Sequence, residues 1–195
     1  MSLLGFSSKA RGVLALWALL AAGETARARV LLPLDQALRV AFGDAAVERQ
    51  ARFLTDAQLA RARELAGEGI EFPSALVTRY AATRNGKAVG MAYFDTHTVR
   101  TLPETVMIVV EPEERVARVE ILSFGEPEDY LPRAGWLRQF SGRPLDPELA
   151  VKRGIHGITG ATLSARAVTK ATRRVLAIHR ALLEAEPGVP RGGKG

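Results

Sequence analysis

The chain of 195 residues contains no cysteine. This absence excludes disulfides, iron–sulfur clusters ligated by the chain, cysteine nucleophiles, zinc ribbons and a lipid-modified cysteine. Only three histidines occur, His97, His156 and His179, and they are too scattered to form a recognisable zinc pattern. We therefore predict no metal site, and any redox chemistry needs a bound cofactor.

A strong basic cluster is also missing, although 27 basic residues face 21 acidic ones. Lys9, Arg11 and Arg27 lie in the first 28 residues with Glu24, so the net charge of +6 falls to +4 without that segment. We therefore expect no nucleic-acid partner, and binding through the arginines of the last helix is the weakest alternative. A hydrophobic content of 47% fits one folded domain rather than a disordered chain.

The longest apolar run is too short to span a bilayer. It covers residues 12–22, whereas a membrane-spanning helix needs about 20 residues. Cations precede the run, and Ala26-Arg27-Ala28 offers small residues at the spacing of a signal-peptidase site. We interpret residues 1–28 as a cleaved signal peptide and expect an exported protein, periplasmic or on the extracytoplasmic face of the membrane. A buried amphipathic helix is the alternative.

Two helices are predicted in an N-terminal segment, residues 29–70. Apolar residues recur at helical spacing over residues 33–43, with Asp35 in the first turn. Thr55 and Gln58 form the pattern of a capping box, and apolar residues then share one face until Gly67. Neither helix carries an obvious chemical group.

The middle of the chain predicts a four-stranded antiparallel sheet. Residues 76–82 and 88–94 flank Asn85-Gly86, which suits a tight hairpin turn, and residues 104–111 and 116–124 flank a second turn. Residues 107–110 are continuously apolar, so we expect that strand to be buried on both faces.

The segment of residues 125–147 holds four prolines and is predicted to be mainly irregular, with a short helical turn at Trp136, Leu137 and Phe140. The aromatic residues there either cover a ligand or belong to the core, and the core is favoured for Tyr130, Trp136 and Phe140. Residues 187–195 are rich in proline and glycine and are predicted to be a disordered tail.

The most informative segment is residues 157–164, which lead into a long amphipathic helix. Its predicted apolar face carries Leu163, Ala167, Ala171, Val175, Ile178 and Leu182, and its other faces carry Arg166, Lys170, Arg173, Arg174 and Arg180. The free N–H groups and the dipole at the helix start favour an anion such as phosphate. The alternative is an ordinary helix cap by Thr159, Thr162 or Ser164, which the residues alone favour.

Thr159-Gly160-Ala161-Thr162, followed by Ser164 and a helix rich in alanine and valine, resembles the flavinylation motif of the FMN-binding domain family. That family includes flavin-bearing subunits of the sodium-pumping NADH:quinone reductase and of the Rnf complex. The order of elements over residues 77–182 is also similar. The resemblance implies an FMN-binding domain over residues 71–186. Its fold would be α+β, a small antiparallel sheet packed against helices with a long C-terminal helix after the attachment loop.

The resemblance further implies a covalent flavin. Thr162 would form a phosphoester with FMN, installed by a separate flavin transferase that uses FAD and magnesium. The implied cofactor-binding residues are His156, Thr159, Gly160, Ala161, Thr162, Leu163 and Ser164. No catalytic residue is implied, so we expect an electron carrier between membrane or extracytoplasmic redox proteins rather than a stand-alone enzyme.

His156 departs from the family pattern, which has aspartate at this position. Because that aspartate belongs to the pattern that the transferase recognises, the histidine bears more on covalent attachment than on FMN binding. The alternative is FMN held without a covalent bond, or a flavin-free structural domain of the same fold. Whether the His156 imidazole contacts the phosphate or has no role stays open.

Overall fold

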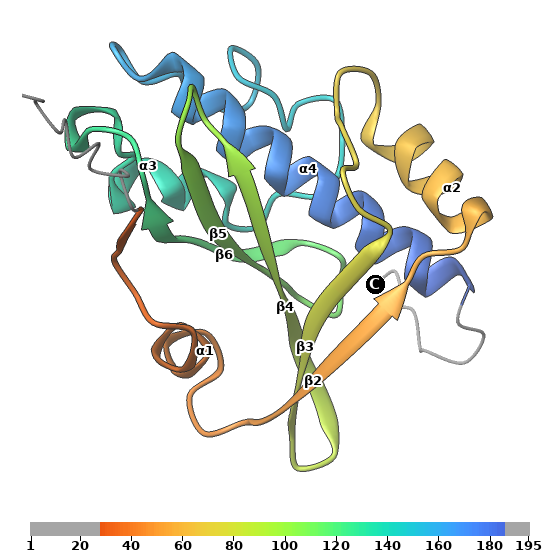
Figure 1. Ribbon diagram of the computed structural model, residues 1–195. Coiled ribbons are helices and arrows are strands. Elements are labelled where there is room, and N and C mark those ends of the chain that lie inside the picture. The colour runs from red at the N-terminus through yellow and green to blue at the C-terminus, as the bar shows by residue number, and fades with distance from the viewer. Residues whose placement is uncertain (1–27, 186–195) are drawn as a thin grey trace, which may run out of the picture.

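The computed structural model describes residues 28–185. The predicted signal peptide, except its last residue, and the predicted tail lie outside the described residues. Six antiparallel strands form one sheet in the order β1-β6-β5-β4-β3-β2 (Figure 1). Their bounds are β1 Arg29–Val30, β2 Ala46–Phe53, β3 Leu76–Arg84, β4 Lys87–Thr98, β5 Pro103–Val110 and β6 Val116–Phe124.

Helices cover both faces of the sheet. The long helix α4 (Thr162–Ala185) crosses one face with α2 (Asp56–Ala66) beside it, whereas α1 (Leu34–Phe42) lies on the opposite face (Figure 1). The larger core cluster lies beneath α4, and a smaller cluster lies beneath α1. This arrangement confirms the predicted α+β class.

The central strand β5 is buried on both faces, as its apolar sequence predicts. Residues 106–110 are all buried, because α4 covers one side of the strand and α1 covers the other. The β3–β4 turn is also as predicted: Asn85 and Gly86 both have positive φ, 52° and 75°, as a two-residue type I′ hairpin turn requires.

Local sequence signals set the helix boundaries. In α2 the Thr55 hydroxyl accepts from the Gln58 N–H at 3.2 Å, and the Gln58 side chain accepts from the Thr55 N–H at 2.9 Å, which confirms the capping box. The predicted turn after β6 consists of a 3₁₀ helix η1 (Glu128–Tyr130), a short helix α3 (Ala134–Leu137) and a second 3₁₀ helix η2 (Arg138–Phe140). Phe140 is buried in the core, and Trp136 is half-buried against it.

Strands β1 and β2 were not predicted. β2 is an edge strand whose side chains are almost all exposed, so the period-2 alternation of apolar residues is absent from its sequence. It forms because β3 offers a complete row of partners, paired along eight residues from Ala46 with Thr83 to Phe53 with Leu76. Residues 46–53 therefore continue the same sheet as the hairpins.

The face assignment along α4 was wrong at two residues. Leu163, expected on the apolar face, is 46% exposed, because the first turn of α4 extends past the sheet. Arg174, expected on a polar outer face, is buried against β4, where it pairs with Asp95. The helical pattern alone places Arg174 in solvent. In the structure, its ion pair with Asp95 allows the side chain to lie in the core.

Candidate functional site

Two hydrogen bonds hold the backbone of the loop before α4 at His156. The indole N–H of Trp136 donates to the His156 carbonyl oxygen at 2.7 Å, and the His156 N–H donates to Gln139 Oε1 at 2.8 Å. One turn earlier, Arg143 Nη2 donates to the Gly154 carbonyl oxygen at 2.7 Å, and Ile155 is fully buried. The short α3–η2 segment therefore positions the approach to α4.

The start of α4 has no side-chain cap. The carbonyl oxygen of Ala161 accepts from the Ala165 N–H at 3.1 Å, so Ala161 takes the cap position, and its methyl group cannot accept a hydrogen bond. Within the described residues, the N–H groups of Thr162, Leu163 and Ser164 bond to no acceptor. These free donors and the positive end of the helix dipole make an anion site, unlike the capped start of α2.

The residues around this helix start leave room for a ligand. The side chains of Thr159, Thr162 and Leu163 are exposed. Gly160 has φ of +80°, a conformation that favours glycine, and no atom lies within 4 Å of where a Cβ would stand. Free amides, open space and the exposed Thr162 hydroxyl together fit the phosphate end of FMN.

The remaining predicted site residues differ in what they can offer. Ser164 is buried and its Oγ has no partner, so it presents its backbone N–H to the helix start rather than its hydroxyl. Ala161 is also buried, and it contributes the small cap residue. The His156 side chain is exposed and makes no hydrogen bond, which leaves its imidazole available beside the loop.

A cavity of about 430 Å³ lies beside the first turns of α4. Ala167, Lys170 and Arg174 line it from α4, residues 96–98 line it from the end of β4, and Gly69, Glu71 and Pro73 close it from the loop after α2. Ala167 follows Thr162 by five residues, or about 7.5 Å along a helix. The cavity is therefore close to the uncapped helix start.

One wall of this cavity contains a charge network that the sequence reading missed. His97 Nδ1 lies 2.9 Å from Asp95 Oδ1, and His97 Nε2 lies 2.9 Å from Glu104 Oε2. Arg174 donates to both Asp95 oxygens at 2.7 Å in a bidentate pair. Glu104 is fully buried, and its Oε1 has no partner. The sequence does contain an indication of this network: Asp95 and His97 are two residues apart on one strand and therefore share a face.

The network keeps His97 charged. Burial lowers its pKa, but the hydrogen bonds to Asp95 and Glu104 more than offset this and raise the pKa to about 9. Burial would raise the pKa of Asp95, yet its bonds to His97 and Arg174 lower it to about 2. Burial, the larger effect for Glu104, raises the pKa of that carboxyl despite the neighbouring His97. A cationic imidazole therefore lines the cavity at neutral pH.

The aromatic residues near the loop divide between core and surface. Phe140 packs edge-on against Trp136 with ring centroids 5.3 Å apart, and it belongs to the core. Tyr130 is half-buried, and the Arg100 guanidinium lies 5.1 Å from its ring centroid. Between residues 28 and 185, no group of three or more histidine, aspartate or glutamate side chains is arranged to hold a metal ion.

Comparison with known families agrees with this geometry. Residues 102–177 match the family profile described as FMN-binding domain, from just before β5 into α4, so the match contains the whole loop and the helix start. It is shorter than the expected span of residues 77–182 and omits the first hairpin. No curated protein matches the chain. With its uncapped, open helix start at Thr162, the matched segment of residues 102–177 is similar to an FMN-binding domain.

Proposed function

We propose that this chain is an exported electron-carrier protein whose FMN is joined through its phosphate to the hydroxyl oxygen of Thr162. The observation that carries the proposal is the uncapped start of α4 beside an exposed threonine hydroxyl. A buried Thr162, or one bonded to the helix N–H groups, would leave no acceptor hydroxyl for the attachment.

The attachment needs an enzyme from outside the chain. Thr162 Oγ forms the new bond to the FMN phosphorus of FAD, the bond between the two FAD phosphates breaks, AMP leaves, and the threonine proton passes to a base. No side chain forms a hydrogen bond with Thr162 within the described residues, so a flavin transferase must supply that base. The chain supplies free amides at Thr162, Leu163 and Ser164, which favour the negative charge of the phosphate.

The cavity beside the first turns of α4 has room for the ring system. FMN, when bound, supplies reversible uptake of one or two electrons. Ala167 leaves space beside the helix, and the lining carries charges of both signs: His97, Lys170 and Arg174 are cationic, Glu71 is acidic, and His97 bonds to Asp95 and Glu104. A cationic group beside the ring would stabilise added electron density. With no further set of groups for substrate chemistry, the chain would pass electrons between membrane or extracytoplasmic partners.

Denaturing gel electrophoresis tests the proposal after co-expression with a flavin transferase. The wild-type band should show flavin fluorescence, because only a covalent flavin stays with the unfolded chain. Thr162→Val should abolish the fluorescence, whereas Thr83→Val, which removes an exposed hydroxyl from β3, should retain it. A dark wild-type band, or a fluorescent Thr162→Val band, would reject the covalent bond.

A second candidate keeps FMN but without the covalent bond, and His156 motivates it. In that case the folded protein would show the visible absorption bands of oxidised flavin, and its band on a denaturing gel would be dark. A folded protein without flavin absorption would instead indicate a structural domain of the same fold.

A further inference from the structure

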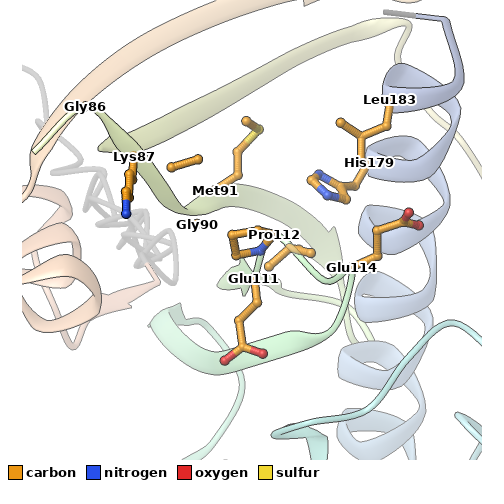
Figure 2. Close-up of a pocket in the computed structure, with 11 residues that line it drawn as sticks. Gly86, Lys87, Gly90, Met91, Glu111, Pro112, Glu114, His179 and Leu183 are labelled. Carbon is orange, nitrogen blue, oxygen red and sulfur yellow. The ribbon is translucent and has the colours of Figure 1, made fainter. Parts of the chain in front are cut away.

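A second cavity, of about 580 Å³, lies at the opposite end of α4 from Thr162. Figure 2 shows His179 and Leu183 of α4 on one side and Gly86 of the β3–β4 turn with Lys87, Gly90 and Met91 of β4 on the other, with Pro112 and Glu114 between them. The volume falls within the range of small-molecule sites, which is about 300–1,000 Å³. Most of the lining surface is apolar, from residues such as Ala88, Met91, Val110 and Leu183.

This cavity is separate from the flavin site. His179 follows Thr162 by 17 residues, or about 25 Å along the helix. Residues 86–91, His179 and Leu183 also lie outside the segment that matches the FMN-binding domain. Val110, Pro112 and Glu114 lie within the matched segment, so the cavity combines residues from inside and outside it.

One buried polar atom in the wall lacks a partner. His179 is only 4% exposed; its Nδ1 lies 2.9 Å from the Tyr93 hydroxyl, and its Nε2 has no hydrogen bond. Burial lowers the pKa of His179 to about 4, with Glu114 opposing and Arg79 and Arg180 assisting, so the imidazole is neutral. An unsatisfied buried N–H destabilises the fold, and a ligand acceptor would remove that cost.

The proton of His179 is on the nitrogen that lacks a partner. The Tyr93 hydroxyl lies 2.9 Å from His179 Nδ1 and 3.3 Å from the Met91 sulfur. An imidazole nitrogen accepts more strongly than a thioether, so Tyr93 donates to Nδ1. The neutral ring then carries its hydrogen on Nε2, a buried donor without a partner on a residue that lines the cavity.

Charged ligands suit this cavity poorly. Glu114, the acidic residue nearest to His179 in Figure 2, is paired with Arg180 at 2.6 Å. Lys87 is exposed at the rim, so a buried anion would have no cation to pair with inside. An apolar body with a single hydrogen-bond acceptor matches both the lining and the lone donor.

We propose that this cavity binds a neutral, mostly apolar small molecule through a carbonyl oxygen that accepts from His179 Nε2. The apolar part lies against Met91, Val110 and Leu183. The flexible thioether of Met91 lets the wall adapt to the shape of the ligand.

A matched pair of probes tests the inference on the full chain: 2-acetylnaphthalene, which has a carbonyl group, and 2-ethylnaphthalene, which has nearly the same shape without one. The ketone should bind at least about tenfold more tightly, as one added hydrogen bond to a buried donor allows. Side-chain ¹⁵N spectra should show the His179 Nε2 signal shifting with the ketone. The signals of His97 and His156 are internal controls and should not move.

Two variants complete the test. His179→Phe should bring the affinity ratio of the two probes to about one, and Ala88→Trp, which fills the cavity from its rim, should weaken both probes at least about tenfold. Equal affinity of the wild type for the two probes, an unmoved His179 signal, or no binding of either probe would overturn the inference. The wild-type spectra decide the question even where a variant does not fold.

Discussion

The indole N–H of Trp136 donates to the carbonyl oxygen of His156 across 2.7 Å, and so ties the α3 segment to the loop that ends at Thr162. Gln139 Oε1 accepts from the backbone N–H of the same residue, His156. The exposed threonine is thus presented by a loop with fixed backbone contacts rather than by an isolated helix end.

Replacing Trp136 tests this positioning. Trp136→Phe removes the hydrogen bond, worth about 1 kcal/mol, and retains an aromatic ring against Phe140. We expect covalent flavin loading to slow several-fold while the unfolding midpoint falls only slightly. Loading is measured as gel fluorescence against time with limiting transferase. Tyr80→Phe, on the α1 face of the sheet, is the control and should load at the wild-type rate. Equal loading rates for Trp136→Phe and Tyr80→Phe would show that the hydrogen bond from Trp136 to His156 does not affect loading.

The residue at position 156 is expected to limit the transferase step. His156→Asp introduces the aspartate that the resemblance places in the flavinylation pattern and should increase the covalently loaded fraction several-fold, as the proposed function expects if a transferase recognises this position. His156→Asn has a similar size without the charge and should give no such increase. The loaded fraction is measured by intact mass spectrometry. Equal loaded fractions for His156→Asp and His156→Asn would mean that the transferase does not recognise the carboxylate.

His97 is expected to contribute to stability far more than the exposed His156. His97→Gln leaves the buried Glu104 without its cationic partner, and breaking a buried pair costs about 3–5 kcal/mol. His156→Gln alters an exposed side chain and should change the free energy of unfolding by less than about 0.5 kcal/mol. Urea unfolding at pH 7 measures both. A loss below about 1 kcal/mol for His97→Gln would contradict the charge network.

His97 and His179 should make the free energy of unfolding depend on pH in opposite directions. The folded pKa of His97 is raised to about 9 from 6.5, so its contribution is complete below pH 6.5 and is lost as the pH rises through 9. The folded pKa of His179 is lowered to about 4, so the unfolded chain binds the extra proton and stability falls as the pH drops from 6.5 towards 4. Each effect is at most about 3 kcal/mol.

Urea unfolding at a series of pH values checks this pair of effects. His97→Gln should flatten the loss of stability on the alkaline side, and His179→Phe should flatten the loss between pH 6.5 and 4. If His97→Gln leaves the alkaline loss of stability unchanged, His97 does not titrate as the structure indicates. The same holds for His179 if His179→Phe leaves the loss between pH 6.5 and 4 unchanged.

Local patterns predicted most of the fold. The capping box at Thr55, the Asn85-Gly86 turn and the apolar strand around Ile108 each rest on contacts between near neighbours, and each is confirmed. β2 could not be predicted, because its pairing with β3 stabilises it and its own sequence has no alternation. Arg174 was misplaced for a related reason: its partner Asp95 is 79 residues earlier in the chain.

In the candidate site, too, some features follow from residues close in sequence and others from contacts between distant segments. The sequence motif predicts Thr162 as the attachment residue, because a glycine, small residues and a long helix follow one another along the chain, and that role stays a prediction. The absence of a cap at Ala161, the tie between Trp136 and His156, and the cluster of His97 with Glu104 depend on how distant segments pack. His179 gave no signal at all, since its lone Nε2 is defined only by its three-dimensional surroundings.

Tandem mass spectrometry of the tryptic peptide of residues 154–166, from protein co-expressed with a flavin transferase, tests the central claim most directly. This peptide contains three hydroxyl residues, Thr159, Thr162 and Ser164. The predicted result is one added FMN, less a water, with fragment ions that place it on Thr162. An unmodified peptide throughout, or FMN placed on Thr159 or Ser164, would contradict the account.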